Sequence, residues 1–337
     1  MLAQSSIVNR ESSMAPALER MNQLPRVPLG HFPTPVERME RLRTAIGGGP
    51  VLLIKRDDAI PFGFGGNKVR KLSWVIGEAL AQQADTIITC GGVQSNHARA
   101  TTAAAVSNGL RAVLVANGTP QSAPTGNALL DALMGAEIHY VESREERVPA
   151  MEALADRLRS EGRRPYVVPL GASTPLGALG YVDAVGELLA QGVRPDVIVH
   201  ACSSGGTQAG ILAGTALYGL EAQVIGVSAD DPASAVTATV RSTLRGMAQL
   251  LGANGARWPD SLAIQVDDTQ VGEGYGVPTL RSREAQQLAA QSEAVFVDHT
   301  YTAKALGALL AWVREGRFTP EQSILFWHTG GQVGLFA

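Results

Sequence analysis

The sequence predicts an α/β protein built on mostly parallel sheets. Short apolar runs rich in β-branched residues alternate with longer stretches in which apolar residues recur every three or four positions. The short runs lack an alternating polar face, which is typical of parallel strands covered by helices on both sides. The chain has 337 residues, 45% of them hydrophobic and 18% charged, so it is long enough for one large domain or two modest ones.

The N-terminal part of the chain is expected to be less regular than the rest. Residues 1–24 are predicted to form a loose extension, and prolines between Pro25 and Pro35 indicate an extended segment before a short helix around Val36–Arg43. Strands and helices then alternate. The predicted strands are Val51–Lys55, Thr86–Cys90, Ala112–Ala116, Glu137–Val141, Tyr166–Pro169, Val197–Ala201, Val224–Val227 and Ile324–Trp327. The predicted helices are Asn96–Asn108, Thr125–Met134, Val148–Ser160, Leu176–Ala190, Thr207–Tyr218, Ala233–Leu251 and Thr302–Glu315, with a less regular stretch before the last.

Composition excludes several kinds of partner. The net charge is only −3, aromatic residues make up 5%, and the basic residues are scattered among acids, so no nucleic-acid footprint is present. Cys90 and Cys202 lie far apart and indicate neither a disulfide framework nor a zinc site. We find no signal-peptide pattern and no apolar run of membrane-spanning length, so we expect a cytoplasmic protein with a small-molecule partner and no membrane contact.

The stretch Gly65–Leu72 is predicted to be a glycine turn that opens an amphipathic helix, because apolar residues recur at i, i+3, i+4 and i+7 from Leu72. Lys68 then lies in the first helical turn, where its charge opposes the positive end of the helix dipole. Such a lysine either is a solvated surface residue or serves a ligand, and this stretch alone leaves both interpretations open.

Two predicted strands end in loops of small and polar residues that lead directly into helices. Gly91–His97 follows Cys90, and Ser203–Thr207 follows Cys202. Ligands bind at such strand ends in open α/β sheets. The second loop has the glycines, hydroxyls and helix N-terminus that favour a phosphate, although a plain helix cap explains its composition equally well. It lacks the patterns of nucleotide-binding loops. A lone phosphate site together with a lysine amine therefore indicates pyridoxal phosphate.

Taken together, Gly65–Leu72, Gly91–Arg99, Ser203–Gly210 and His328–Gly331 resemble the fold-type II pyridoxal-phosphate enzymes, in the group of aminocyclopropane-carboxylate deaminase and D-cysteine desulfhydrase. The resemblance extends from about Gly30 to the end of the chain. It implies two domains, each a twisted, mostly parallel sheet flanked by helices, with the cofactor in the cleft between them. The implied division is an extension at 1–24, a large domain at 25–70 and 179–337, and a small domain at 71–178, in a homodimer.

The same resemblance implies roles for individual residues. Lys68 would carry the cofactor as a Schiff base, Asn96 would contact its ring hydroxyl, and Ser95 would face the substrate on the side opposite Lys68. The implied catalytic residues are Lys68, Ser95, Tyr275 and Tyr301. The implied cofactor-binding residues are Lys68, Asn67, Lys71, Asn96, Ser203, Ser204, Gly205, Gly206, Thr207 and Thr329. The implied substrate-binding residues are Ser95, Asn96, His97, Tyr275 and Tyr301, and no metal is implied.

Two positions discriminate within the group. Cyclopropane deaminases have a glutamate after the second tyrosine and a leucine before the tail glycines, whereas this chain has Thr302 and Thr329. That pattern resembles the D-cysteine desulfhydrases and L-cysteate sulfo-lyases. A hydroxyl leaves the cofactor ring a weaker electron sink than a carboxylate would, which suits expulsion of a good β leaving group better than opening of a carbon ring.

We therefore expect a carbon–sulfur lyase of the D-cysteine desulfhydrase type, which eliminates the β-substituent of a small amino acid. The alternatives are L-cysteate sulfo-lyase, aminocyclopropane-carboxylate deaminase, and a non-catalytic protein that binds the cofactor or an amino acid. The handedness of the substrate stays open, because D- and L-substrates present the Cα proton to opposite faces of the cofactor.

Several residues outside these motifs carry expectations of their own. The bulky loop Ala59–Phe64 and the pair His299-Thr300 depart from the family pattern and are expected to reshape the substrate pocket. One of Asp57 and Asp58 is expected to pair with Arg56. Lys304 is expected on a helix surface. The histidines of the strand and helix ends are expected to make hydrogen bonds rather than bind metal, and these are His97, His200 and His328.

Overall fold

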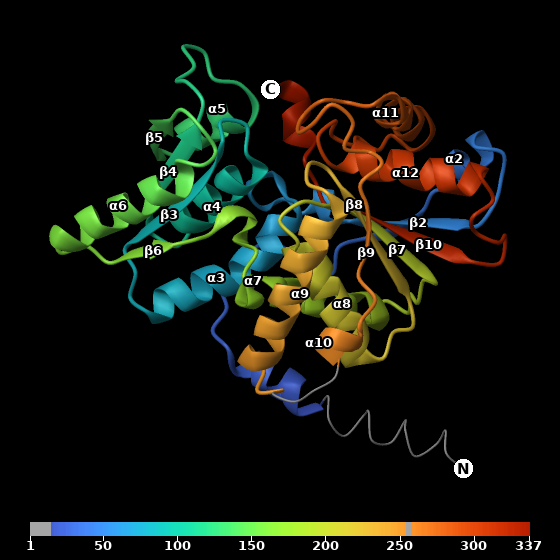
Figure 1. The fold of residues 1–337 in the computed structure, drawn as a ribbon, viewed down its shortest axis with the longest axis horizontal. Helices are drawn as coiled ribbons and strands as arrows, with labels where there is room; N and C mark the ends of the chain where they lie inside the picture. Colours follow the sequence, from blue (N-terminus) through green and yellow to red (C-terminus); the bar gives the residue numbers. More distant parts are fainter. Residues whose placement is uncertain (1–14, 254–257) are drawn as a thin grey trace.

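The computed structural model describes residues 15–253 and 258–337, which form two sheets side by side (Figure 1). The larger sheet has the order β1 (Val36–Arg38), β2 (Val51–Arg56), β10 (Ser323–His328), β7 (Val197–Cys202), β8 (Gln223–Ser228) and β9 (Gln265–Asp267). The smaller has the order β5 (Glu137–Val141), β4 (Arg111–Asn117), β3 (Thr86–Gly92) and β6 (Pro165–Val167). Every neighbouring pair is parallel except β1 with β2, which confirms the predicted fold class.

Helices cover both faces of the larger sheet. On one face lie α7 (Pro175–Ala190), α8 (Gly206–Tyr218) and α9 (Ala233–Leu250), and on the other lie α2 (Glu40–Ala45), α11 (Leu280–Glu293) and α12 (Thr302–Arg314). Strand β7 contributes to the hydrophobic cores on both faces of the sheet. Ile198 packs against the helices of the first face, while Val197 and Val199 pack against those of the second. A strand whose two faces are both buried has no polar alternation, which is why the sequence shows a continuous apolar run here.

The smaller sheet is covered in the same way. One face packs on α3 (Asn67–Ala81) and α4 (Asn96–Val106), and the other on α6 (Arg147–Ser160). Helix α5 (Gly126–Leu133) packs against α4 and the C-terminal turn Gln332–Phe336 (Figure 1). Helices α3 and α7 contact each other, and the predicted domain limits at 70/71 and 178/179 fall inside them. Those limits stay a prediction.

Several elements differ from the sequence prediction. Residues 15–23, predicted to be part of a loose extension, are helical and bury Ala17 and Met21 against the core of the larger sheet. The segment predicted as one helix around Val36–Arg43 begins as the edge strand β1 before α2 starts at Glu40. The stretch predicted to be less regular contains α10 (Trp258–Ser261), β9 and α11. The first part of the extension lies outside the described residues.

The four lysines of the chain all lie inside the protein. Lys55, Lys71 and Lys304 are at most 1% exposed, and Lys68 is half-buried. The prediction that Lys304 lies on a helix surface is wrong. Within the described residues, no helix combines the length and apolar character needed to cross a bilayer.

Candidate active site

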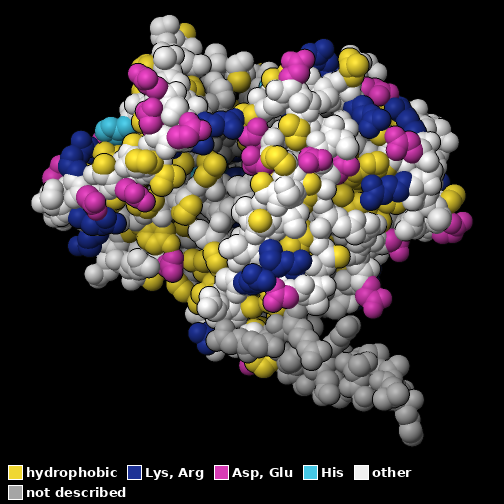
Figure 2. Space-filling model, viewed as in Figure 1, with side chains coloured by type: hydrophobic (Ala, Val, Ile, Leu, Met, Phe, Trp, Pro, Cys, Tyr) yellow, Lys and Arg dark blue, Asp and Glu magenta, His cyan; other side chains and the backbone are white. Residues whose placement is uncertain are grey.

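The principal cavity lies between the two sheets, at the carboxyl ends of their strands, and has a volume of about 470 Å³. This volume is within the range of small-molecule sites. Figure 2 shows a hollow between the two halves of the molecule, with basic and acidic side chains at its rim. The predicted site residues that line the cavity are Asn67, Lys68, Ser95, Asn96, His97, Ser203, Ser204, Gly205, Thr207, Tyr275, Tyr301 and Thr329.

Lys68 reaches the cavity because a glycine turn sets the position of the first turn of α3. Gly65 and Gly66 have φ values of +68° and +95°, and a Cβ on Gly66 would lie 3.0 Å from the carbonyl oxygen of Thr329. Such a backbone favours glycine. The N–H of Gly66 donates to Asp57 O, and the N–H of Asn67 donates to Thr329 O. These bonds join the start of α3 to the ends of β2 and β10, and so fix the position of Lys68.

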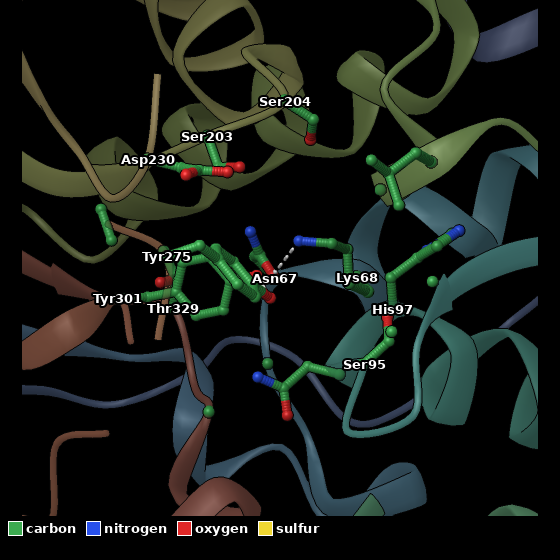
Figure 3. Close-up of a pocket in the computed structure, with 18 of the residues that line it drawn as sticks. Asn67, Lys68, Ser95, His97, Ser203, Ser204, Asp230, Tyr275, Tyr301 and Thr329 are labelled. Atoms are coloured by element: carbon green, nitrogen blue, oxygen red, sulfur yellow. Dashed lines mark hydrogen bonds between the residues drawn. The ribbon is translucent and has the colours of Figure 1, made fainter. Parts of the chain in front are cut away.

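The Lys68 amine has one hydrogen-bond partner among the described residues, Asn67 Oδ1 at 3.0 Å (Figure 3). Asn67 in turn donates from Nδ2 to Thr207 Oγ1 at 3.0 Å, which ties the lysine to the loop after β7. Burial lowers the pKa of Lys68 to about 8, and the charge of Arg99 adds to this effect. An amine with such a pKa is a better nucleophile at neutral pH than an ordinary lysine.

We expect the cofactor-free protein to capture pyridoxal phosphate faster as the pH rises through 8, because only the neutral Lys68 amine attacks an aldehyde. The rate at pH 9 should exceed the rate at pH 7 by about tenfold, as the neutral fraction does. The folded pKa is lower than that of an unfolded lysine, so this group also makes the folded protein more stable as pH rises from 8 towards 10.5. Stopped-flow absorbance measures capture, and a rate that stays flat until pH 10 would contradict the lowered pKa.

The loop after β7 forms a cup at the N-terminus of α8. Gly205 takes the left-handed conformation, with φ +75° and ψ −25°, and is the N-cap of α8. Ser203, Ser204, Gly205 and Thr207 line the cavity, so hydroxyls and the positive end of a helix dipole face the same space. Gly206 is buried behind the cup, where a Cβ would lie 2.7 Å from Ser173 Oγ.

Lys71, which the resemblance implies as a cofactor-binding residue, does not line the cavity. Its Nζ donates to Ser173 Oγ at 3.0 Å, and Ser173 Oγ lies 2.7 Å from Ser204 Oγ. Burial lowers the pKa of Lys71 well below its usual value, and the Lys68 charge adds to this. Lys71 therefore supports the cup through Ser173. No local motif marks Ser173, so the sequence did not single it out.

The loop after β3 places the next three predicted residues. Ser95 is the N-cap of α4, and its Oγ accepts a hydrogen bond from Ala98 N at 3.1 Å. Asn96 is oriented by Asn127, whose Nδ2 donates to Asn96 Oδ1 at 3.0 Å and also to Gln94 O. Asn127 is fully buried and lies on α5, which is distant in sequence.

His97 lines the cavity as a neutral, hydrogen-bonded ring. Thr89 Oγ1 lies 2.8 Å from His97 Nε2 and donates its own proton to Val168 O, so Nε2 must be the donor to Thr89. Nδ1 faces the hydroxyl of Thr101 at 3.3 Å. Burial holds the pKa of His97 well below its ordinary value, with Lys68 adding to the effect. The ring is thus placed to orient its neighbours and not to carry a proton at neutral pH.

Tyr275 and Tyr301 face each other in the cavity, with hydroxyl oxygens 2.5 Å apart and rings in an edge-to-face arrangement. In the view of Figure 3 they lie on one side of the Lys68 amine, and Ser95 and His97 lie on the other. Burial raises the pKa of both phenols, for Tyr301 well above its usual value. Both therefore hold their protons at neutral pH.

Thr329 lines the cavity, but Thr302 does not. The Thr302 hydroxyl donates to Asp298 Oδ1 at 2.7 Å and accepts from Asp298 N. Asp298 also accepts from the backbone N–H groups of Thr300, Tyr301 and Thr302. This buried aspartate, which the sequence reasoning missed, therefore fixes the turn that carries Tyr301.

Other predicted features lie outside the cavity. Neither Phe62 nor Phe64 lines it, although the carbonyls of Phe64 and Gly65 accept hydrogen bonds from Arg99. The side chains of the loop Ala59–Phe64, which were expected to reshape the substrate pocket, therefore do not line it. Arg56 pairs with Asp58 at 2.8 Å as expected.

Charged residues at the edge of the cavity were missed by the sequence reasoning. Arg144, from the loop after β5, pairs through Nη1 with Asp230 Oδ2 at 2.8 Å, from the loop after β8. Its guanidinium lies 4.8 Å from the centre of the Tyr275 ring. This contact joins the two sheet units across the cavity.

The site fits pyridoxal phosphate. A hydroxyl-lined helix N-terminus suits the phosphate, Lys68 offers a primary amine of lowered pKa, and a cavity of about 470 Å³ separates these groups from the phenols. Lys68, Asn67, Asn96, the cup residues and Thr329 are the residues that would hold the cofactor.

The chain resembles known proteins over most of its length. Residues 27–330 match the family described as pyridoxal-phosphate dependent enzyme. A D-cysteine desulfhydrase of Klebsiella pneumoniae is 35% identical over 95% of this chain and 98% of its own. A Pyrococcus abyssi protein named provisionally as a 1-aminocyclopropane-1-carboxylate deaminase is also 35% identical, over 94% of each chain.

Solved structures agree with this similarity. The crystal structure of an ACC deaminase homologue superposes with a TM-score of 0.87 at 36% identity and covers 95% of this chain and 96% of its own. A fungal L-serine ammonia-lyase from Rhizomucor miehei superposes with a TM-score of 0.68 at 16% identity, covering 92% of this chain and 96% of its own, which shows a shared fold.

Proposed function

Because the chain belongs to the pyridoxal-phosphate-dependent enzymes, in the group of aminocyclopropane-carboxylate deaminase and D-cysteine desulfhydrase, we propose that it eliminates the β-substituent of a small amino acid. With D-cysteine, the balanced reaction takes up one water and yields pyruvate, ammonia and hydrogen sulfide. The observation that carries the proposal is the arrangement of the Lys68 amine and the paired Tyr275 and Tyr301 hydroxyls around one cavity.

Bound pyridoxal phosphate would supply an aldehyde for the substrate amine and a conjugated ring that withdraws electrons from Cα. The residues of the chain would carry out proton transfer and substrate binding. The Lys68 amine, once free, would take a proton from Cα, a role that its lowered pKa supports. Tyr275 and Tyr301, which keep their protons at neutral pH, would donate to the departing sulfur or hold the substrate. Ser95 would bind the substrate carboxylate or move a proton on the opposite side.

The lack of a carboxylate at the position after Tyr301 supports elimination over ring opening. Thr302 has its hydroxyl bound to Asp298, whereas Thr329 lines the cavity. The acids that line the cavity are Glu145, Asp230 and Asp231, all in loops at its edge. We further propose a homodimer, which light scattering of the purified protein would test.

We expect D-cysteine and β-chloro-D-alanine to exceed aminocyclopropane carboxylate by about 100-fold or more in kcat/KM, because their leaving group carries the electron pair away. The assay measures the released 2-oxo acid, which is pyruvate from the β-substituted substrates and 2-oxobutanoate from aminocyclopropane carboxylate. The panel should include L-cysteine, L-cysteate and β-chloro-L-alanine, so that handedness and leaving group are measured together. Strong turnover of aminocyclopropane carboxylate would overturn the argument from Thr302 and Thr329. Release of neither pyruvate nor 2-oxobutanoate from any of these compounds, with the cofactor bound, would favour the non-catalytic alternative.

A further inference from the structure

A fully buried lysine lies beneath the wall of the cavity that carries the two tyrosines. Lys304 is on the first turn of α12 and is 0% exposed. Its Nζ donates to three backbone carbonyls, Ala229 O at 3.1 Å, Val271 O at 2.9 Å and Gly274 O at 2.9 Å. An ammonium group has three protons to donate, so its hydrogen-bonding capacity is filled. Burying this charge is costly unless each proton is used, as it is here.

Two of the three carbonyls belong to residues that directly precede residues lining the cavity. Ala229 immediately precedes Asp230, and Gly274 immediately precedes Tyr275. Lys304 itself lies three residues after Tyr301, the N-cap of α12. One ammonium group therefore joins three segments. These are the loop after β8 that carries Asp230, the loop of residues 268–279 that carries Tyr275 (the Tyr275 loop), and α12, whose N-cap is Tyr301.

The Tyr275 loop depends on contacts from outside itself. Gly272, Gly274 and Gly276 have φ values of +63°, +135° and +78°, and no helix or strand lies between Asp267 and Leu280. The internal bonds of the loop are long, with Gly274 N at 3.3 Å from Val271 O and Val277 N at 3.3 Å from Gly274 O. Glycines leave such a segment many alternative conformations, so an anchor is needed to select one.

Arg144 holds the same wall from the other side of the cavity. It pairs with Asp230 and lies over the Tyr275 ring. Asp230 and Tyr275 are thus joined twice, once through Arg144 at the edge of the cavity and once through Lys304 beneath it. These contacts hold the Tyr275 ring where its hydroxyl meets the Tyr301 hydroxyl.

We propose that Lys304 is a positioning residue, which holds the Tyr275 loop against α12 so that the Tyr275 phenol meets Tyr301 in the cavity. Lys304 does not line the cavity, so it acts on the reaction only through this loop. The expected effect of Lys304 on the kinetics rests on the proposed elimination, whereas its expected effect on the order of the Tyr275 loop does not.

The test uses Lys304→Met, which keeps the length of the side chain and removes the donors. Lys55→Met is the matched control. Lys55 is also 0% exposed and donates from Nζ to Thr34 O, Glu187 Oε1 and Gln191 Oε1, away from the cavity. Hydrogen exchange of the cofactor-loaded protein, followed by mass spectrometry, measures the order of residues 271–276.

We expect exchange in residues 271–276 to rise by about tenfold or more in Lys304→Met and to stay unchanged in Lys55→Met. Unchanged exchange in Lys304→Met, or an equal rise in both variants, would overturn the proposal whether or not the protein is a lyase. If Lys304→Met does not fold, Lys304→Gln is measured by the same criteria, because it retains two donors at a shorter reach.

Kinetics provide a second, independent criterion if the elimination is observed. Lys304→Met should lower kcat/KM by about 30-fold in the parent but by about threefold or less in a Tyr275→Phe background, because coupled residues are non-additive. Equal losses in both backgrounds would show that Lys304 acts on stability alone and would contradict the proposal.

Discussion

Replacement of Lys68 by alanine is expected to abolish both the visible absorption of the bound cofactor and the release of pyruvate. The loss in kcat should be about 10³-fold or more, because this amine would join the cofactor and, in the proposed elimination, would also move the Cα proton. Its position is set by the backbone bonds of Gly66 and Asn67, so the substitution should leave the fold intact. Absorbance and pyruvate formation from D-cysteine are the measurements.

Lys68→Arg is the matched control for charge. It keeps a cation in the cavity, but a guanidinium neither condenses with an aldehyde nor loses its proton at neutral pH. We expect it to be as inactive as Lys68→Ala while unfolding at a temperature close to that of the parent. A Lys68→Ala protein that keeps both the yellow colour and pyruvate release would contradict the assignment of Lys68.

The second large effect concerns stability. Asp57 is 0% exposed and accepts hydrogen bonds from Arg70, Tyr181, Trp327 and Thr34. Removing one partner of a buried ion pair leaves the other charge uncompensated, so Asp57→Ala should lower the free energy of unfolding by about 3–5 kcal/mol. Urea unfolding followed by circular dichroism measures this.

The pH dependence of that loss follows from the carboxyl group. Burial by itself would raise the pKa of Asp57, but the charge and hydrogen bonds of Arg70 outweigh it and lower the pKa. A lowered pKa contributes stability above the unfolded value near 4 and loses it as pH falls through the folded value. The difference in the free energy of unfolding between the parent and Asp57→Ala should therefore become smaller at acidic pH.

Asp260→Ala is the control for the stability argument, because Asp260 pairs with Arg245 on the surface and both side chains are more than half exposed. It should change the free energy of unfolding by less than about 1 kcal/mol, as exposed pairs do. An equally small change in Asp57→Ala would show that the buried cluster does not stabilise the fold.

The sequence predicted most of the central strands and helices because both faces of each sheet are buried. The apolar runs of β7 and β10 are therefore unmistakable. The edge strands β1 and β9, with three residues each, carry too little pattern to be found. The helix at 15–23 is amphipathic, but only its packing on the core makes it more than a loose extension.

The site residues that the sequence predicts differ from those it misses in whether a local sequence motif marks them. Lys68, Ser95, Asn96 and the cup loop lie in short motifs next to strand ends, where spacing along the chain is informative. Asp298 acts on its close neighbours at 300–302. In contrast, Ser173, Asn127 and Arg144 act through contacts between segments that are far apart in sequence. No local pattern marks such residues. Lys304 was misplaced because most lysines are exposed, whereas this one is held by three carbonyls.

Reduction of the loaded protein with borohydride tests directly whether Lys68 carries the cofactor. Reduction makes the bond between cofactor and amine permanent, and peptide mapping by mass spectrometry then identifies the residue. The chain has only four lysines, and Lys71 lies one helical turn from Lys68, so the map must separate these two. We predict that the cofactor is found on Lys68 alone. Its recovery on Lys71, Lys55 or Lys304, or on no lysine at all, would contradict the account.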